Sequence, residues 1–229
     1  MSANEVLAVD QSVGGRRLAE VDHCVEAILN WALETFGEEQ IVKAKEDFFL
    51  LTGKVFPEDA YYHARMSYFL DYYVFQRMLE STDPEYRGLT PFQAFSRHQD
   101  DCSGSKCGIS NFRHSLFRVH RLGSDLTIKD MLTGQKYTVL KRENETFEGM
   151  AKKTLFQGFL YINEESSFLS YGLVAHPGDC DKVIQNYLKA AQKAFVDEIT
   201  ILSRLAILHL RFLRHPRIQP KTIYGDGRI

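Results

Sequence analysis

The sequence predicts an α+β protein, and changes in the spacing of its apolar residues lead to this prediction. Over the first hundred residues, apolar side chains recur three or four positions apart, which is typical of helices. Further along the period becomes two, as where Phe117 and Val119 alternate with Arg118 and His120. A helical period then returns near the C-terminus. We therefore expect an N-terminal helical sub-domain, a small antiparallel β-sheet or barrel in the middle, and a long C-terminal helix or helix pair.

The composition sets the broad class of protein. At 229 residues, with 44% hydrophobic and 25% charged residues, the chain has the size and balance of a globular protein with a substantial core. A formal net charge of -2 gives no overall attraction to nucleic acid or anionic lipid, so such binding would need a local patch. The four cysteines lack framework spacing, the N-terminus lacks signal-peptide features, and no apolar run could span a bilayer. These observations predict a cytoplasmic protein with reduced thiols.

The helical sub-domain is predicted over residues 17–98, after a loose tail at 1–16. A first helix is expected to end at Gly37, and a second should run from about residue 38 to 51 and stop before Gly53. Glycines at these points suit helix ends because they adopt left-handed backbone angles without strain.

A third helix, from Pro57 to Leu79, is expected to form the centre of the fold. Proline suits its first turn, where an N–H would have no partner. The segment carries two neighbouring apolar stripes at helical spacing, and a helix with two apolar faces belongs in a protein interior. The first stripe contains Met66, Phe69, Leu70, Tyr73 and Val74, and the second contains Tyr61, Tyr68, Tyr72, Phe75 and Leu79.

The middle of the chain is expected to form a polar loop at 99–114 and an antiparallel β sub-domain at 115–178. Before the loop, Thr90 and Pro91 are typical of the N-cap and first residue of a short helix that reaches about Arg97. The predicted strands follow one another without helices between them, which favours an antiparallel sheet or a small barrel.

C-terminal helices are predicted over 179–215, followed by a basic extended tail at 216–229. The helical pattern allows either one long helix or two with a break near Asp197. In its later half a second apolar face needs to be covered, either by the protein's own fold or by a partner. This second face contains Ile201, Leu205, Leu208 and Phe212.

Five segments of the sequence carry a resemblance to known proteins: MSYFLDYYVFQR, GLTPFQAF, FRHSLFRV, LTIKDMLTGQKYTV and AHPGD. Together they resemble a group of uncharacterised bacterial proteins, some of which carry a separate Cys-rich zinc-binding tail of the SEC-C type. The resemblance covers roughly half of the chain, and this chain has no such tail, so no metal site is carried over. The group has no named activity, and the resemblance therefore implies the order of the sub-domains and no catalytic residue.

A polar row along the predicted central helix is the first candidate site. Asp59, His63, Ser67 and Asp71 each follow the last by four residues, so they would stack along one edge of that helix. A serine beside a histidine that a carboxylate orients is the arrangement of a hydrolase nucleophile. Three side chains that point the same way from one helix suit this chemistry poorly, and a buried or solvent-facing polar edge is the alternative interpretation.

A second candidate is a zinc site made by His98, Cys102, Cys107 and His114. Two thiolates and two imidazoles are a normal tetrahedral ligand set for zinc. The spacing is irregular and lacks a C-x2-C pair, so an ordinary surface loop with unpaired thiols is the alternative. We expect no cofactor.

A third candidate is the basic C-terminal segment. Arg211, Arg214, Arg217 and Lys221 could hold phosphates, while Tyr224 could stack on a base. The neighbouring Leu208 and Phe212 could instead contact a protein partner or a second copy of the chain.

The expected function is a non-enzymatic, cytoplasmic protein-interaction or regulatory module. The phosphate-binding, dinucleotide-binding, zinc-protease and EF-hand motifs are absent from the sequence. A nucleic-acid-binding protein that uses the basic segment is the alternative function, and a hydrolase that uses the row at Asp59, His63 and Ser67 is the third.

Overall fold

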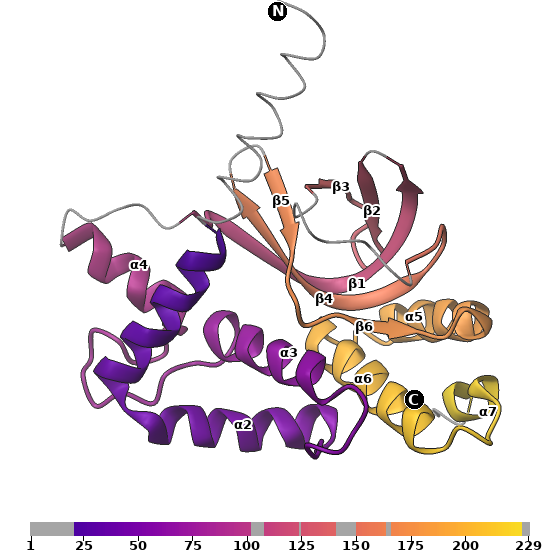
Figure 1. Ribbon diagram of the computed structural model, residues 1–229, viewed down its shortest axis with the longest axis horizontal. Helices are drawn as coiled ribbons and strands as arrows, with labels where there is room; N and C mark the ends of the chain where they lie inside the picture. Colours follow the sequence, from indigo (N-terminus) through magenta and orange to yellow (C-terminus); the bar gives the residue numbers. More distant parts are fainter. Residues whose placement is uncertain (1–20, 102–107, 124, 141–149, 164–165, 226–229) are drawn as a thin grey trace, which may run out of the picture.

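The computed structural model describes residues 21–101, 108–123, 125–140, 150–163 and 166–225, and it confirms the α+β class (Figure 1). The sheet curls into a barrel, and the N-terminal and C-terminal helices pack together beside it. Among the described residues, no helix is both long enough and apolar enough to cross a membrane.

The N-terminal part is helical, as predicted. Residues 21–36 form a helix, and α2 (Glu38–Thr52) and α4 (Pro91–Asp101) lie on either side of α3 in the sequence. Gly37 and Gly53 end the first two helices with φ angles of 78° and 88°, so both predicted stops are confirmed.

The central helix α3 (Tyr62–Phe75) is shorter at both ends than the predicted span from Pro57 to Leu79. Before it, the carboxylate of Asp59 accepts a hydrogen bond from the Phe56 backbone N–H at 2.8 Å, which holds the chain in a turn. After it, the Leu79 backbone N–H donates to the Leu89 carbonyl at 2.8 Å. Both ends are therefore fixed by contacts that helical periodicity cannot reveal.

The middle of the chain forms a closed barrel with one attached strand. Strands β1, β2, β3, β5 and β4 pair in that order, β1 also pairs with β4, and β6 adds to β4. The pairings are antiparallel except between β3 and β5, which pair in parallel at Val139 and Ser167. The strands are β1 (Asn111–Leu122), β2 (Leu126–Asp130), β3 (Lys136–Val139), β4 (Leu155–Asn163), β5 (Ser166–Leu169) and β6 (Val174–His176).

The barrel interior is filled by side chains that alternate along the strands, which is the packing expected of a small barrel. Its buried members are Phe117, Val119, Leu126, Ile128, Val139, Phe156, Leu160 and Leu169.

The predicted loop at 99–114 and its boundaries need correction. Helix α4 continues to Asp101, and β1 already begins at Asn111. Thr90 and Gln93 cap α4 reciprocally, since each backbone N–H donates to the other's side-chain oxygen, at 3.0 and 3.3 Å. The start of α4 agrees with the prediction, whereas the predicted C-terminal end at about Arg97 comes too early.

The C-terminal part consists of separate helices, which confirms the predicted break near Asp197. A short 3-10 helix η1 (Gly178–Cys180) leads into α5 (Asp181–Lys193), and α6 (Glu198–Arg214) follows. Asp197 caps α6, because its side chain accepts from the Thr200 backbone N–H at 2.9 Å.

The predicted extended tail contains a further helix instead, α7 (Pro220–Gly225). Proline fits the first position of this helix, and the side chains of Ile223 and Tyr224 are buried against the preceding helices. Residues 226–229 of the predicted tail lie outside the described residues.

Helix α6 contacts α2, α7, β1 and β6, so its apolar face is covered by the protein's own fold. Nearby, the chain between β5 and β6 passes very close to α3: a Cβ atom on Gly172 would lie 2.3 Å from the Tyr68 backbone nitrogen. Helices α3 and α6 thus join the barrel to the remaining helices (Figure 1).

The cysteines depart from the expectation of reduced thiols. Cys24 is disulfide-bonded. Cys180 is a free, buried thiol, and its burial raises the pKa to about 11, so it stays protonated at neutral pH. Sequence spacing alone does not reveal which cysteines are oxidised.

Candidate functional site

A cavity of about 80 Å³ lies between the turn that precedes α3 and the C-terminal half of α6. Its walls combine two arginines, one carboxylate and several apolar side chains. We call it the arginine pocket, and it is lined by Val55, Asp59, Ala60, Tyr61, Arg65, Leu210, Leu213 and Arg214.

Arg65 is the unusual residue of this pocket, because it is charged and only 1% exposed. Its Nη2 donates to the Thr52 carbonyl at the end of α2, at 2.6 Å. Its Nε and Nη1 are buried and have no acceptor in the part of the chain that the structure describes. Burial lowers the pKa of Arg65 to about 10, so it remains a cation at neutral pH. Leaving buried donors of a cation unsatisfied is costly, at about 1–3 kcal/mol or more each.

Arg214 and Asp59 form the outer edge of the pocket. The Nη2 atom of Arg214 donates to Asp59 Oδ2 at 2.8 Å and to the Lys54 carbonyl at 2.7 Å. The guanidinium also lies over the Phe56 ring, 5.6 Å from its centroid. The hydrogen bond from Arg214 keeps the pKa of Asp59 below its ordinary value. Since 36% of the Arg214 side chain is exposed, this edge faces solvent.

A row of rings leads from the pocket into the interior. Tyr61, which lines the pocket, meets His209 edge to face at 6.0 Å, and His209 meets His176 at 5.8 Å. His176 in turn meets Tyr224 of α7 at 5.8 Å. Burial, together with the charge of Arg65, lowers the pKa of His209 to about 4. These histidines are therefore neutral at neutral pH.

Behind this row, hydrogen bonds form a continuous chain whose direction can be assigned. Gln157 Nε2 donates to the Tyr68 hydroxyl oxygen at 3.0 Å, so Tyr68 donates its own proton to His114 Nε2 at 2.6 Å. Gln157 Oε1 accepts from His176 Nε2 at 3.2 Å, which leaves His176 Nδ1 to accept from the Tyr224 hydroxyl at 2.9 Å. The chain links α7, β6, β4, α3 and β1, and it requires neutral histidines throughout.

His114, a member of the predicted zinc set, belongs to this interior chain, where its Nε2 is occupied by the Tyr68 hydroxyl. Its ring stacks on Phe159 at 4.2 Å with an interplanar angle of 1°, and burial lowers its pKa to about 3. His98 stacks on Trp31 at 5.4 Å. Cys102 and Cys107, the other two members of the predicted zinc set, lie outside the described residues. Within the described residues, no group of three potential metal ligands occurs.

The predicted catalytic row is wrong for Asp59, because that residue lies in the turn before α3 and is held by Arg214. His63 is exposed on the surface of the helix. Asp71 is buried and accepts a hydrogen bond from the Tyr161 hydroxyl. Asp59 is therefore not placed to orient His63 towards Ser67, as the predicted row requires.

Ser67 and Asp71 do line a common cavity, of about 170 Å³. Its wall includes Asp22, which accepts from the Tyr171 hydroxyl at 3.0 Å. The carboxylates of Asp71 and Asp22 thus both accept hydrogen bonds from tyrosine hydroxyls. His63 does not line this cavity, so the cavity does not bring the predicted base to the serine.

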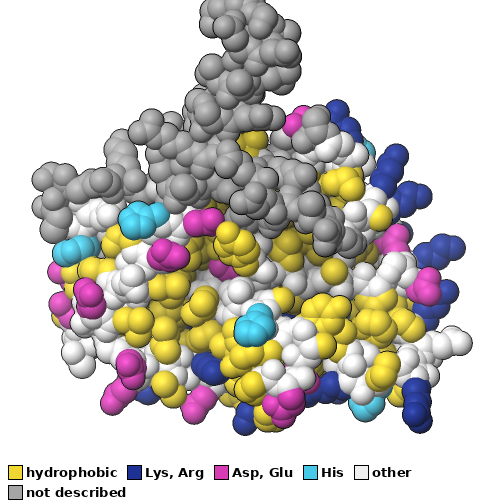
Figure 2. Space-filling model, in the orientation of Figure 1, with side chains coloured by type: hydrophobic (Ala, Val, Ile, Leu, Met, Phe, Trp, Pro, Cys, Tyr) yellow, Lys and Arg dark blue, Asp and Glu magenta, His cyan; other side chains and the backbone are white. Residues whose placement is uncertain are grey.

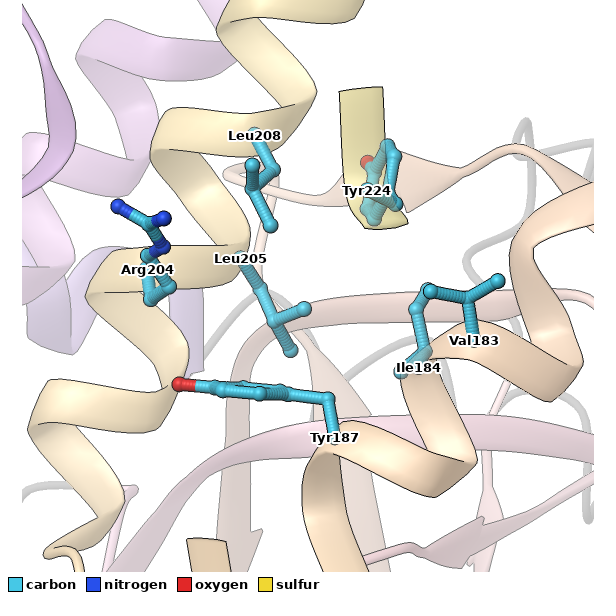
Figure 3. Close-up of a pocket in the computed structure, with 7 residues that line it drawn as sticks. All are labelled: Val183, Ile184, Tyr187, Arg204, Leu205, Leu208 and Tyr224. Carbon is cyan, nitrogen blue, oxygen red and sulfur yellow. The ribbon is translucent and has the colours of Figure 1, made fainter. Parts of the chain in front are cut away.

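The basic C-terminal segment does not form one free strip. Arg214 is held in the pocket edge, and Tyr224 is buried and bonded to His176, so Tyr224 cannot stack on a base. Arg204 lies at the edge of a small space with Tyr187 below it, where α5, α6 and α7 meet (Figure 3). That space has a volume of about 10 Å³, which is room for at most one water molecule.

The remaining candidates divide between surface and core. Arg211, Arg217 and Lys221 are exposed. Leu208 is only 3% exposed, so the prediction that it contacts a partner is corrected. Phe212 is half-buried and packs against the same cluster, and its contact with a partner stays a prediction. Figure 2 shows many of the visible Lys and Arg side chains along the edge of the molecule where β2 and α5 lie.

Sequence reasoning missed Arg65, although a signal was present. Residues 61, 65, 68 and 72 share one face of the predicted central helix, and Arg65 is the charged position within that tyrosine-rich stripe. A lone arginine in an apolar stripe indicates a buried cation that needs an acceptor. Arg214, which completes the pocket, lies 149 positions later, and no local pattern connects the two.

Comparison of the chain with models of protein families, with curated proteins and with solved structures gives no match. The functional argument therefore depends on the geometry of the arginine pocket.

Proposed function

We propose that this protein is a non-enzymatic regulatory module that binds a small anionic ligand in the arginine pocket. The observation that carries the proposal is Arg65, a buried cation whose Nε and Nη1 have no acceptor among the described residues. An anion in the adjoining cavity would place a compensating negative charge beside the Arg65 guanidinium. Hydrogen bonds between a guanidinium and an anion are about twice as strong as those between neutral groups.

The position of the pocket supports a regulatory role. Its walls come from the turn before α3 and from α6, which are held together here by the pair between Asp59 and Arg214. An anion that contacts Arg65 and Arg214 would add a second connection between these two parts. The lining residues offer hydrogen-bond donors and apolar carbon, rather than a nucleophile beside a base.

Thermal unfolding of the full chain tests this function. Melting temperatures would be compared in sodium acetate, sodium phosphate and sodium sulfate, each against sodium chloride at the same ionic strength. A ligand present at about 100 times its Kd stabilises the folded state by about 2.7 kcal/mol. For a chain of this size we expect this to raise the melting temperature by about 5 to 10 °C.

Variants distinguish a site from a general salt effect. Arg65→Met and Arg214→Gln should each abolish most of the anion-dependent rise. Arg211→Gln is the matched control, because Arg211 is an exposed arginine of the same helix and does not line the pocket. The proposal is wrong if no anion exceeds chloride, or if the rise persists in both pocket variants.

A second candidate function, docking of a protein partner, is favoured by one residue. Phe195, between α5 and α6, is 95% exposed and has a left-handed backbone φ of 54°. A wholly exposed aromatic ring is a typical anchor at protein interfaces, and the backbone angle is unfavourable for a residue other than glycine. Phe195→Gly should leave folding intact and abolish co-purification of a stoichiometric protein in pull-down experiments. A pull-down in which the variant captures the same proteins as the wild type would exclude this role.

A further inference from the structure

We infer that the ligand of the arginine pocket is a short-chain monocarboxylate, with its carboxylate between Arg65 and Arg214 and its hydrocarbon part against the apolar wall. This inference rests on the proposed function, and it adds the chemical class of the ligand.

The charge of the pocket matches a single negative charge. Its lining residues contain two cations, Arg65 and Arg214, and one anion, Asp59. Their sum is one positive charge. A carboxylate would neutralise it fully, and its planar pair of oxygens suits the fork of a guanidinium.

The other walls suit hydrocarbon. Val55, Ala60, Leu210 and Leu213 supply carbon surface beside the charged groups. The volume of about 80 Å³ is several times the roughly 10–15 Å³ that a cavity needs to hold one water molecule. The pocket therefore has room for a carboxylate with a short hydrocarbon chain, whose carbon atoms would lie against these walls.

A phosphate group fits the charge less well. At neutral pH a phosphate monoester carries about -1.5 to -2 charges. The additional charge would lie near the Asp59 carboxylate, which Arg214 and the Phe56 backbone N–H hold in place at the pocket edge. The second charge of a phosphate exceeds the single positive charge of the pocket and would be repelled by Asp59, so we expect phosphate to bind about tenfold more weakly than a carboxylate.

Isothermal titration calorimetry with sodium acetate, propionate, butyrate and phosphate at constant ionic strength tests the ligand class. Each added methylene that enters the apolar part should increase affinity by up to about fourfold. Phosphate should bind at least about tenfold more weakly than butyrate. Asp59→Asn should reduce the difference in affinity between butyrate and phosphate, because it removes the negative charge that repels phosphate. The amide oxygen of the new side chain can still accept hydrogen bonds from Arg214 and the Phe56 backbone N–H.

The outcomes separate this inference from the proposed function. Affinity that rises from acetate to butyrate and exceeds that of phosphate supports the monocarboxylate. Phosphate that binds as tightly as butyrate, or an affinity independent of chain length, overturns the monocarboxylate and leaves an anion site. If none of the four anions binds and the thermal experiment shows no rise, both the inference and the proposed function are wrong.

Discussion

Acidification should destabilise this protein well above the pH range in which its carboxylates titrate. His114 and His209 have pKa values lowered to about 3 and about 4 by burial, whereas an exposed histidine in an unfolded chain has a pKa of about 6.5. Below pH 6.5 the unfolded chain therefore binds protons that the folded chain does not bind. The free energy of unfolding consequently falls as the pH falls, and it is independent of these two residues above about pH 7.5.

The size of this loss in stability follows from the pH range over which the unfolded chain binds protons that the folded chain does not bind. Each pH unit below 6.5 costs about 1.36 kcal/mol per histidine that stays neutral in the folded state. From pH 6.5 to pH 5 the loss is thus about 2 kcal/mol for each of His114 and His209, or about 4 kcal/mol together. The pKa of His176 is lowered in the same direction by burial and by the neighbouring His209. A domain typically has a total stability of about 5–15 kcal/mol, so a substantial fraction is lost by pH 5.

Urea unfolding at several pH values between 8 and 5, at constant ionic strength, measures this dependence. His114→Phe keeps a ring to stack on Phe159 and should reduce the slope below pH 6 by about 1.4 kcal/mol per pH unit. His63→Gln is the matched control, because His63 is exposed, and it should leave the slope unchanged. A wild-type stability that is constant from pH 7 to pH 5, or a slope that His114→Phe does not alter, would refute the assignment of neutral buried histidines.

Three further predictions concern stability. Arg65→Met should leave the melting temperature without anion unchanged or higher, because it removes a buried cation with unsatisfied donors. If urea unfolding instead shows that the free energy of unfolding falls by more than about 3 kcal/mol, Arg65 is satisfied in the fold. Gly172→Ala should lower the free energy of unfolding by about 3 kcal/mol or more, because its Cβ would lie 2.3 Å from the Tyr68 backbone nitrogen. The loss would be measured as a fall in melting temperature, and a variant of normal stability would contradict this close approach. Asp130→Ala should cost about 3–5 kcal/mol in chemical denaturation, because it leaves the Arg113 donor at 2.7 Å and the Ser115 hydroxyl at 2.6 Å without their buried acceptor.

The features that the sequence predicted correctly depend on local chemistry. Gly37 and Gly53 end helices because glycine accepts left-handed backbone angles, and Asp197 begins one because its carboxylate can cap the first turn. The alternation along β1 and β2 reflects the barrel interior, which one face of each strand fills. Such signals lie within a few residues of the structure that they determine.

The features that were mispredicted depend on distant contacts. Helical periodicity places Asp59 inside a helix, but its pairing with Arg214 and with the Phe56 backbone holds it in a turn. His114 resembles a metal ligand in the sequence, yet α3 supplies Tyr68 and β4 supplies Phe159 to surround its ring. The arginine pocket likewise requires residues from two segments, 55–65 and 210–214, that lie far apart in the sequence, so no single stretch of sequence contains its pattern.

The separation of 155 positions between Asp59 and Arg214 also sets when the pocket can form during synthesis. Ribosomes add about 5–20 residues per second, so Arg214 is made roughly 8 to 30 seconds after Asp59. Until then Arg65 has neither the opposite wall nor the exclusion of water that α6 provides. The proposed anion site would therefore be complete only late in synthesis, when α6 docks, and its occupancy would report that these two distant segments have come together.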